Sequence, residues 1–551
     1  MQGLMQDVPL NLPNLIRHAE RLHPGKRVTT RTTDGIRSAT FAEVIERSRR
    51  LAAALRGLGV QDDERVATLC WNHQQHLEAY IAAPCMGAVL HTLNLRLFPD
   101  DIAYIVEHAQ DRVLILDKSL WPLWEKVAPR VTCVRDVIVI DDVPGPRIPG
   151  THDFEELIAR SEPLDYAPDL PERQAAAMCY TSGTTGHPKG VVYSHRSNVL
   201  HSYALSLVDC FALSERDVSI LVVPMFHANA WGLPYACLMI GSDIVFPGRF
   251  MVPDMIASLM AETGVTCGGG VPTILQAVLP ALIKVKDQLK SLNRVLCGGS
   301  ALPAALQAAY RKELGIQVLH AWGMTETSPL GTMARPLRIH DQAPPGKLAD
   351  DLLSQGRPLF GVEVRIVGDS GLELPWDGRS VGELQARGNW VSSSYYNDDT
   401  SPEKFKDGWL CTGDVATIDE NGYVRIADRT KDLVKSGGEW ISSIAIEGLI
   451  MAHPDVAEAA VIAVFHPKWD ERPLACVVAK PEAKGRLSRS FASGLATTQA
   501  RGRSSHLGWK TAITAASATS GWPMIRPSMA TLEIHSPPDF TRSLVRSAMR
   551  T

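Results

Sequence analysis

The chain has 551 residues, 45% of them hydrophobic, and a formal net charge of −4. This length predicts several domains, or one large domain with a smaller satellite. The apolar fraction excludes a largely disordered chain, and the nearly balanced charge gives no sign of a nucleic-acid partner. Because no uninterrupted apolar run reaches about 18 residues and the N-terminus has no basic start followed by an apolar block, we expect neither a transmembrane helix nor a signal peptide.

The first half of the chain alternates between helical and strand patterns. Helical periodicity runs over residues 40–58 behind a Thr that can serve as the N-cap, and a strand pattern follows over 65–70. Another amphipathic helix is predicted over 99–107 and a buried strand over 113–116. The alternation continues to about residue 260. It predicts an α/β fold of layered, mainly parallel sheets and helices.

The pattern changes at Gly361. The segments GVEVRIV, VGELQAR and GYVRIAD are short alternating strands, which predicts a β-rich subdomain. The charged, glycine-containing segment DRTKDLVKSGGEWISS begins at Asp428 and predicts a hinge, and the patterns after it predict a small α+β domain. The predicted division is a large domain over 1–427, a hinge over 428–432, a partial small domain over 433–484 and an atypical tail over 485–551.

The segment YTSGTTGHPKGV begins at Tyr180 and follows an apolar strand pattern over 175–179. A loop of small hydroxyl and glycine residues ending in Lys189 can turn several N–H groups, hydroxyls and one ammonium toward a single anion, which is typical of a polyphosphate site. It is not a Walker A loop, because GxxxxGK[ST] is absent. An ordinary Ser/Thr/Gly-rich surface loop is the alternative, but the order of residues is more particular than the composition.

This segment resembles the phosphate-binding signature of the adenylate-forming (AMP-binding) enzymes, which include acyl-CoA synthetases, peptide-synthetase adenylation domains and luciferases. Further motifs between residues 12 and 480 follow the order of that family. The resemblance implies a large ATP-binding domain, a smaller mobile C-terminal domain, Mg²⁺, and coenzyme A as co-substrate. The residues that it implies around the β- and γ-phosphates are Thr181, Ser182, Gly183, Thr184, Thr185, Gly186 and Lys189, with Thr181 also near the metal.

The segment HAWGMTETSP resembles the second signature of the family. The resemblance implies that Trp322 stacks on adenine and that Gly323 and Met324 lie beside the nucleotide. Thr325 would hydrogen-bond the α-phosphate, and Glu326 would hold Mg²⁺, a hard cation that prefers oxygen ligands. Outside such a motif, a carboxylate at this position would more often belong to the surface or to a helix N-terminus.

Two shorter motifs complete the implied nucleotide site. In CGGSA, after an apolar strand pattern, Gly299 and Ser300 match residues that line the adenine and the acyl carbonyl, although a tight turn before a helix at Pro303 is the alternative. In TGD, after Gly-Trp-Leu, Asp414 matches the residue that accepts both ribose hydroxyls. A TGD segment by itself is commonly only a turn.

The segment DRTKD matches the hinge of the family. The resemblance implies that Arg429 contacts the ribose or a phosphate. It also implies that the backbone rotates at Lys431 to move the small domain between its two half-reaction positions. Lys435 and the following Gly-Gly-Glu match the face used in the thioester step. A solvated, charged interdomain linker is the alternative.

The segment PMFHANAWGLPY indicates the acid site. The resemblance implies that His227 lies beside the reacting carboxylate and that Trp231 is the aromatic gate of fatty-acid members, although both residue types are also common in cores. The pocket wall is matched by Gly268, Gly269 and Gly270, which leave room for an acyl chain and offer no group to bind an amino group. This pattern favours a fatty acid over an amino acid.

The tail contains one lysine, Lys510, and two acidic residues, Glu533 and Asp539. Its helical and strand periodicity is weak. Such a stretch should pack poorly. In the family this region ends in a Gly-Lys element whose lysine reaches the active site, and the sequence has no match to it. We hypothesise an altered reading frame, which resequencing the gene would test. Loss of that lysine predicts adenylation slower by about 10²–10³.

The motifs favour an ATP-dependent fatty-acid–CoA ligase that activates a medium- or long-chain acid to an acyl-adenylate and transfers it to coenzyme A. A short thioether or branched acid, or another acceptor, stays open. A degenerate paralogue that binds ATP or acyl-AMP without turnover is the alternative of another class. The ten cysteines form no CxxC pair, which predicts reduced thiols in a cytoplasmic protein. Fatty-acid members are often homodimers, and peripheral membrane association stays open.

Overall fold

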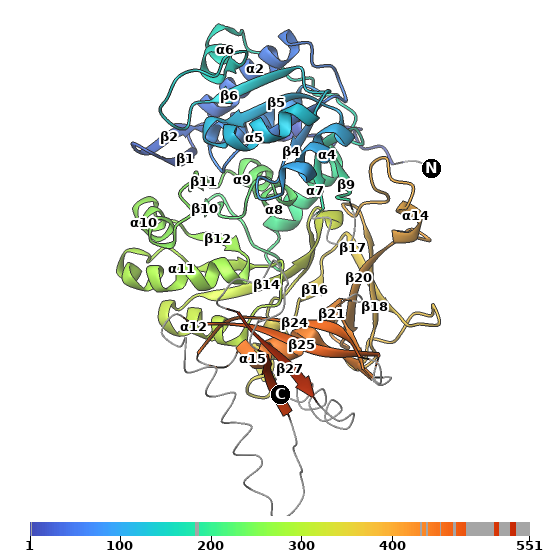
Figure 1. Cartoon of the computed structure of the whole chain (residues 1–551). Helices are drawn as coiled ribbons and strands as arrows, with labels where there is room; N and C mark the ends of the chain where they lie inside the picture. Colours follow the sequence, from blue (N-terminus) through green and yellow to red (C-terminus); the bar gives the residue numbers. More distant parts are fainter. Residues whose placement is uncertain are drawn as a thin grey trace, which may run out of the picture. The chain divides into compact units, whose positions relative to one another are not determined.

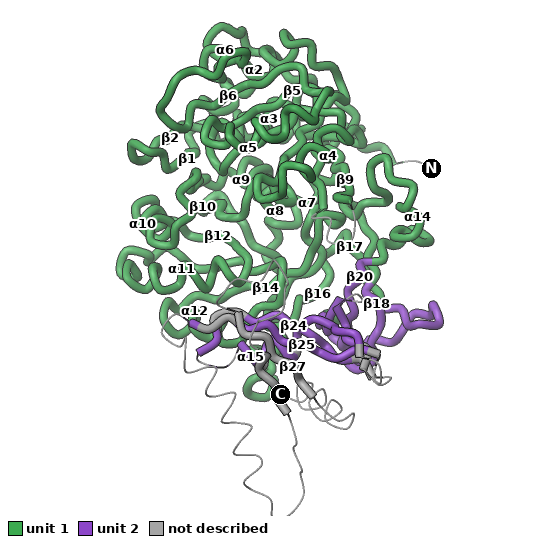
Figure 2. Tube along the Cα trace, viewed as in Figure 1, with its two compact units in different colours: residues 1–365, 385–411, 422–424 green, residues 366–384, 412–421, 425–551 purple. Residues whose placement is uncertain are grey.

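A computed structural model of the chain describes residues 1, 3–181, 187–429, 432–436, 439–451, 453, 455–466, 470–480, 512–516 and 529–535. The chain divides into two compact units, which Figure 2 shows in green and purple. Unit 1 comprises residues 1–365, 385–411 and 422–424, and unit 2 comprises residues 366–384, 412–421 and 425–551. Among the described residues, no helix has both the length and the apolar character needed to cross a membrane.

The first sheet of unit 1 has seven strands in the order β7-β6-β5-β3-β4-β8-β9, and all neighbours are parallel except the last pair. Its strands are β3 (Arg65–Leu69), β4 (Val89–Thr92), β5 (Asp111–Asp117), β6 (Asp136–Ile140), β7 (His152–Asp153), β8 (Ala175–Tyr180) and β9 (Gly190–Ser194). The accompanying helices are α2 (Phe41–Gly57), α3 (Gln74–Cys85), α4 (Pro99–Ala109), α5 (Trp121–Val127) and α6 (Phe154–Arg160).

Helix α2 illustrates how local sequence starts an element. The Thr40 hydroxyl accepts a hydrogen bond from the Glu43 N–H, and the Glu43 carboxylate accepts one from the Thr40 N–H at 2.7 Å. This capping box satisfies two N–H groups that the helix cannot pair internally. The predicted helix over 40–58, with Thr40 as its N-cap, is therefore confirmed.

The second sheet of unit 1 has nine strands in the order β16-β15-β14-β13-β12-β10-β11-β1-β2, with parallel pairing from β14 to β1 (Figure 1). Its strands are β1 (Arg27–Thr32), β2 (Gly35–Thr40), β10 (Val218–Ile220), β11 (Asp243–Phe246), β12 (Cys267–Gly270), β13 (Arg294–Cys297), β14 (Gln317–Gly323), β15 (Leu330–Met333) and β16 (Arg357–Pro358). The other helices of unit 1 are α1 (Leu12–Leu22), α7 (His195–Ser206), α8 (Ala228–Trp231), α9 (Leu233–Ile240), α10 (Pro253–Thr263), α11 (Pro272–Lys284), α12 (Ala304–Leu314), α13 (Lys347–Leu353) and α14 (Ser401–Lys404). The predicted mainly parallel α/β fold is confirmed.

Apolar side chains of α10, α11 and α12 form one core cluster with the middle strands of this sheet. Val295 and Val318 contribute from β13 and β14, and Leu259, Leu282 and Tyr310 contribute from the three helices. Burial of each such side chain stabilises the fold by roughly 1.5–3 kcal/mol before conformational entropy is subtracted. The strands that lead to the candidate site are thus held rigidly.

The β-rich part after residue 361 was also predicted, and its strands are β17 (Val362–Val367), β18 (Gly382–Gly388), β19 (Phe405–Lys406), β20 (Trp409–Ile418) and β21 (Val424–Arg429). Unit 2 also contains helix α15 (Ser443–Met451), which packs on β24. Its six-stranded sheet comprises β22 (Val434–Ser436), β23 (Glu439–Ile441), β24 (Val456–His466), β25 (Asp470–Ala479), β26 (Ala512–Ala516) and β27 (Met529–His535). Two strands of the atypical tail, β26 and β27, therefore belong to this sheet, and the rest of the tail lies outside the described residues.

Candidate active site

The candidate site residues of unit 1 follow neighbouring strands of the nine-stranded sheet. Strands β10, β12, β13 and β14 run parallel in that order, so their carboxyl ends share one edge. His227 follows β10, Gly270 ends β12, Gly299 follows β13 and Glu326 follows β14. The carboxyl edge of a parallel sheet is where α/β proteins bind ligands. Chain order alone separates these residues widely, and strand pairing brings them together.

The phosphate-loop candidate connects the antiparallel strands β8 and β9. The Thr181 N–H donates to the Lys189 carbonyl at 2.9 Å, and the Lys189 N–H donates to the Thr181 hydroxyl at 3.1 Å. These bonds close the base of the loop. Its other predicted residues, which are Ser182, Gly183, Thr184, Thr185 and Gly186, lie outside the described residues.

The Lys189 ammonium is engaged by the segment that follows β18. Its Nζ atom lies 2.9 Å from Oδ2 of Asp398 and contacts the Thr400 hydroxyl. It also lies 5.0 Å from the centre of the Tyr395 ring, within the range of a cation–π contact. The sequence did not single out these three partners.

Thr325 and Glu326 are buried just beyond β14. The Tyr395 hydroxyl donates to Oε1 of Glu326 at 2.5 Å, and the Tyr193 hydroxyl donates to the Thr325 carbonyl at 2.7 Å. Burial, with the Glu326 carboxylate adding to it, raises the pKa of Tyr395 far above its usual value, so the phenol keeps its proton and remains the donor. Tyr395 thus contacts both the loop lysine and this carboxylate.

Magnesium was predicted from the motif, and the donor set is compatible with it. Mg²⁺ prefers carboxylate and hydroxyl oxygen and retains several waters. The Glu326 carboxylate supplies a buried anionic oxygen pair, of which Oε1 carries the bond from Tyr395. Thr181 supplies a hydroxyl at the start of the loop. These oxygens fit the chemistry of the ion.

His227 is solvent-exposed, but its surroundings are dense in protein atoms. Desolvation by those atoms, with the positive charge of Arg96 adding to it, lowers the pKa of His227. At neutral pH the imidazole is therefore uncharged and can donate one hydrogen bond and accept another. The next four residues, Ala228 to Trp231, all have left-handed backbone angles, with φ between 42° and 57°.

Trp231 is buried, and its indole packs against two glycines. A Cβ atom added at Gly269 would lie 3.6 Å from Cζ3 of the indole, and one added at Gly298 would lie 3.3 Å from Cη2. Next to Gly269 is an apolar cavity of about 30 Å³, enclosed by β10, β12, β13 and helices α10–α12. Its described lining has no charged or amide side chain.

The second-signature residues are held by strand pairing. Trp322 pairs with Thr332 of β15, and its indole is buried against Gly331, where an added Cβ would lie 2.5 Å from Cζ3. The backbone of Gly323 approaches the Pro329 carbonyl so closely that a side chain has no room. Gly299 has φ of +83°, which favours glycine. Ser300 is exposed, and Met324 is partly buried.

Unit 2 holds the remaining predicted residues. Oδ1 of Asp414 lies 3.5 Å from Nε of Arg429, and the Thr412 hydroxyl accepts from the Asp414 N–H at 3.1 Å. Asp414 is buried and Arg429 is exposed. Lys435 lies in β22, whereas Lys431 falls outside the described residues.

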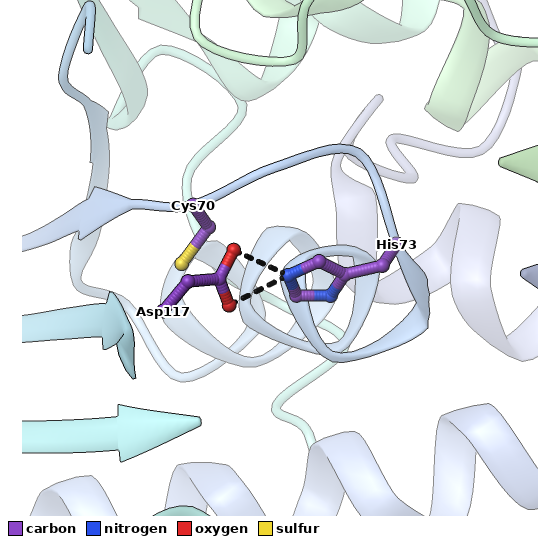
Figure 3. Close-up of side chains that lie close together, drawn as sticks. All are labelled: Cys70, His73 and Asp117. Carbon is purple, nitrogen blue, oxygen red and sulfur yellow. Dashed lines mark hydrogen bonds and ion pairs between the residues drawn. The ribbon is translucent and has the colours of Figure 1, made fainter. Parts of the chain in front are cut away.

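A separate buried cluster joins Cys70, His73 and Asp117 (Figure 3). Nε2 of His73 lies 2.9 Å from both Asp117 oxygens, and Nδ1 of His73 accepts from the His76 N–H at 3.2 Å. Because Nδ1 is an acceptor, Nε2 carries the proton and donates to the carboxylate. A metal at Nε2 would have to displace this bond. We therefore interpret the cluster as a structural hydrogen-bond network.

Sequence reasoning missed Tyr395, Asp398 and Tyr193. Tyr193 adjoins the loop motif, and two tyrosines followed by two aspartates in YYNDD could have signalled polar contacts near the site. Nothing in the sequence indicates which residues they contact.

Comparisons with known proteins identify the family of the chain. The family model described as AMP-binding enzyme matches residues 16–396, and that described as AMP-binding enzyme C-terminal domain matches residues 445–498. The chain is 45% identical over 482 residues to the 3-methylmercaptopropionyl-CoA ligase of Ruegeria pomeroyi, with 87% of this chain and 89% of that protein covered. It is 42% identical over 506 residues to the medium-chain-fatty-acid–CoA ligase of Ectopseudomonas oleovorans, with coverage of 91% and 92%.

A solved structure shares the fold. The chain resembles the crystal structure of an anthranilate CoA ligase in complex with anthranoyl-AMP, with a TM-score of 0.77 and 28% identity. The similarity covers 88% of this chain and 91% of that one.

Proposed function

The chain belongs to the family of AMP-binding enzymes and is an ATP-dependent acid–thiol ligase, and we propose that its acid is a medium- or long-chain fatty acid. A carboxylate oxygen of the acid bonds to the α-phosphorus of ATP while the bond to pyrophosphate breaks, which gives an acyl-adenylate. The sulfur of coenzyme A then loses its proton and bonds to the acyl carbonyl carbon, and AMP leaves. The cofactors are ATP, Mg²⁺ and coenzyme A.

In this proposal, the residues of unit 1 position charge more than they transfer protons. Lys189 neutralises the β- and γ-phosphates, Thr325 hydrogen-bonds the α-phosphate, and Glu326 with Thr181 holds Mg²⁺, which when bound neutralises phosphate charge. Support comes from the carboxyl edge of the sheet, where Thr325 and Glu326 follow β14, and from Tyr395, which links Glu326 to Lys189.

His227 is proposed beside the reacting carboxylate. Its lowered pKa leaves it neutral near pH 7, so it can donate a hydrogen bond to the acid without forming a salt bridge that would weaken the nucleophile. Its place after β10 puts it on the same sheet edge as Gly299 and Ser300, which are proposed to line the adenine and acyl carbonyl.

The nucleotide roles in unit 2 are proposed from motif position. Asp414 would accept the ribose hydroxyls, and Arg429, whose charge faces Asp414, would contact the ribose or a phosphate. Lys431 would serve as the hinge and Lys435 would act in the thioester step. The ten cysteines are all free thiols, which supports a reducing, cytoplasmic location.

The observation that carries the substrate proposal is the apolar cavity beside Gly268 and Gly269. The lining has no charged or amide side chain, and its one phenol, Tyr310, already donates to the Leu275 carbonyl at 2.8 Å, so the lining suits a hydrocarbon chain better than an amino or carboxylate group. The cavity has room for about one methyl-sized group while the Trp231 indole lies over Gly269. A longer chain requires side chains of this lining to move.

A short thioether acid is the second candidate. The small volume of the cavity favours it in this conformation, and a 45% identical relative is a 3-methylmercaptopropionyl-CoA ligase. Its terminal methylthio group is about as apolar as a methylene chain and meets the same lining. The two candidates differ in length and not in polarity.

Turnover with a series of acids tests the proposal. Pyrophosphate release and acyl-CoA formation are measured with ATP, Mg²⁺, coenzyme A and butanoate, octanoate, dodecanoate or 3-(methylthio)propanoate. We expect matched release of both products, with kcat/KM rising from butanoate to octanoate or dodecanoate. A maximum at 3-(methylthio)propanoate would replace the fatty-acid proposal by the thioether one. ATP binding without either product would favour a degenerate enzyme.

A further inference from the structure

Lys189 forms an ion pair with Asp398, whose carboxylate is oriented by hydrogen bonds from Thr400. Oδ1 of Asp398 accepts from the Thr400 N–H at 2.8 Å and from the Thr400 hydroxyl at 2.7 Å, which orients Oδ2 toward Nζ of Lys189, 2.9 Å away. Burial alone would raise the pKa of Asp398, but the Thr400 and Lys189 contacts outweigh it and lower the pKa. The partner of the loop lysine is therefore an ionised carboxylate.

Tyr395 extends this contact to the second charged group of the site. Its ring lies under the Lys189 ammonium, and its hydroxyl donates to Oε1 of Glu326. One side chain thus touches the cation proposed for the phosphates and the anion proposed for Mg²⁺. Because the phenol donates to Oε1, the carboxylate is held in one orientation.

The segment carrying these residues is anchored on one side and open on the other. The Tyr396 N–H donates to the Gly190 carbonyl of β9 at 2.8 Å, and the Ser392 N–H donates to the Glu326 carbonyl at 2.7 Å. On the open side, a recess of about 380 Å³ is lined by Ser194 and Ser197 together with residues 389–397. The segment is tied to the site but is not packed on all sides, so its side chains have space to rearrange.

We propose that Tyr395, Asp398 and Thr400 form a latch that holds Lys189 and Glu326 in the nucleotide-free enzyme. When ATP binds, Lys189 leaves Asp398 and Thr400 and contacts the polyphosphate. The proposal rests on the ligase function and adds positioning residues to it. Asp398 and the phosphates carry the same charge sign, so they compete for one ammonium. Tyr395 stays on Glu326 and keeps that carboxylate oriented after Lys189 leaves.

The latch makes two separable predictions for ATP and Mg²⁺. Asp398→Asn removes the competing charge but keeps an oxygen for Thr400, so the Kd for ATP falls about two- to fivefold, the range expected for one partly exposed ion pair. Tyr395→Phe keeps the ring beneath Lys189 but removes the donor to Glu326. Because a carboxylate that loses its outer-shell partner binds metal less well, the Mg²⁺ concentration for half-maximal pyrophosphate release rises roughly tenfold.

The experiment uses the full chain and direct titration of ATP–Mg²⁺ without acid, followed by acid-dependent pyrophosphate release over a range of Mg²⁺ concentrations. The matched control is Asp399→Asn, which makes the same charge change on the exposed neighbouring residue. We expect the control to leave the Kd for ATP unchanged. Thermal midpoints of all variants, measured first, show that each is folded.

Several results would overturn the latch. If Asp398→Asn and Asp399→Asn changed the Kd for ATP equally, the effect would come from long-range electrostatics and not from a contact of Asp398 that competes with the phosphates. Weaker ATP binding by Asp398→Asn would mean that Asp398 builds the phosphate site. An unchanged Mg²⁺ dependence in Tyr395→Phe would remove Tyr395 as a positioning residue. Binding of ATP by the unaltered chain without acyl-CoA formation would refute the ligase function and leave the binding test of the latch intact, whereas no ATP binding would refute both.

Discussion

The indole of Trp231 lies against the backbone of Gly298, where an added Cβ atom would stand 3.3 Å from Cη2. The same ring lies close to Gly269, where an added Cβ atom would stand 3.6 Å from Cζ3. In the proposed acid site this ring would restrict the length of acid that can enter, and Gly269 and Gly298 leave space for it.

If Trp231 is the aromatic gate of the proposed acid site, Trp231→Ala should make room for longer acids. We expect the ratio of kcat/KM for dodecanoate to that for butanoate to rise at least several-fold, since the longer chain gains the most from the space of the indole. Truncating a buried Trp also costs roughly 3–5 kcal/mol of stability, so thermal midpoints accompany the kinetics. Trp231→Phe, which retains a ring, is the matched variant and should shift the ratio less. A ratio that is the same in both variants and in the parent would show that the indole does not limit chain length.

Gly268→Ala and Gly270→Ala form a second matched pair. A Cβ at Gly268 would lie 2.6 Å from Cγ2 of Ile220, whereas a Cβ at Gly270 would meet Ile274 and Leu275 at an ordinary 3.5 Å. We expect Gly268→Ala to destabilise the protein by about 1–3 kcal/mol through overpacking and to reduce activity with long acids. Gly270→Ala should remain within about 0.5 kcal/mol of the parent. Urea denaturation of both variants checks this order, and the reverse order would contradict it.

Ala230→Gly should stabilise the protein. Ala230 has φ of 51° within the left-handed turn Ala228–Trp231, a conformation that costs a non-glycine residue about 1–2 kcal/mol. Glycine removes that strain but loses about 0.5–1 kcal/mol to backbone entropy, so the expected net gain is about 0.5–1 kcal/mol. The control is Ala236→Gly in the right-handed helix α9, which should destabilise. Loss of stability in both variants would show that the left-handed turn is not strained.

Stability should fall on acidification below about pH 6.5. Burial lowers the pKa of His76 and His201 to about 3 and that of His195 to about 4. Between those values and the unfolded value near 6.5 the unfolded chain binds more protons, so the free energy of unfolding decreases as the pH falls through this window. Between pH 7 and pH 5, each imidazole lowers the free energy of unfolding by roughly 2 kcal/mol. Urea midpoints measured at pH 7, 6 and 5 test the trend. His201→Gln should flatten it, and equal slopes in the variant and the parent would contradict the assignment.

Glu326→Gln should abolish most turnover without unfolding the chain. Loss of the carboxylate that is proposed to hold Mg²⁺ is expected to reduce kcat by about 10²–10³, the usual cost of one preorganised electrostatic contact in an active site. Removal of Mg²⁺ with a chelator should stop pyrophosphate release in the parent and leave its thermal midpoint unchanged. A lower midpoint after chelation would indicate a structural metal, and the cluster of Cys70, His73 and Asp117 would be its first candidate.

The sequence was most informative where function depends on consecutive residues. The Thr181–Lys189 loop, the Thr325–Glu326 pair and the TGD segment are recognisable because a site proposed to hold phosphate, metal or ribose needs backbone turns and short side chains next to one another. The strand and helix patterns likewise gave the α/β fold, since an element buries a periodic face. The capping box of α2 was foreseeable for the same local reason.

Local sequence patterns could not predict which residues contact these groups. Tyr395 bonds Glu326 across 69 residues, and Thr400 contacts Lys189 across 211. The phosphate loop also closes a β-hairpin because β8 pairs with β9. The left-handed turn at Ala228–Trp231 opposes the intrinsic preference of alanine and exists only because its surroundings enforce it.

The amino-acid sequence by itself determined the chemistry of this protein, because each motif carries its hydroxyls, glycines and charges within a few residues. Only the tertiary structure decided how those groups are restrained. Parallel strand order brings His227, Gly299 and Glu326 to one edge, and Asp398 and Tyr395 then hold the charges there. Contacts between distant segments depend on the packing of the whole core. That packing is the free-energy minimum of the entire chain, and no short stretch of sequence specifies it.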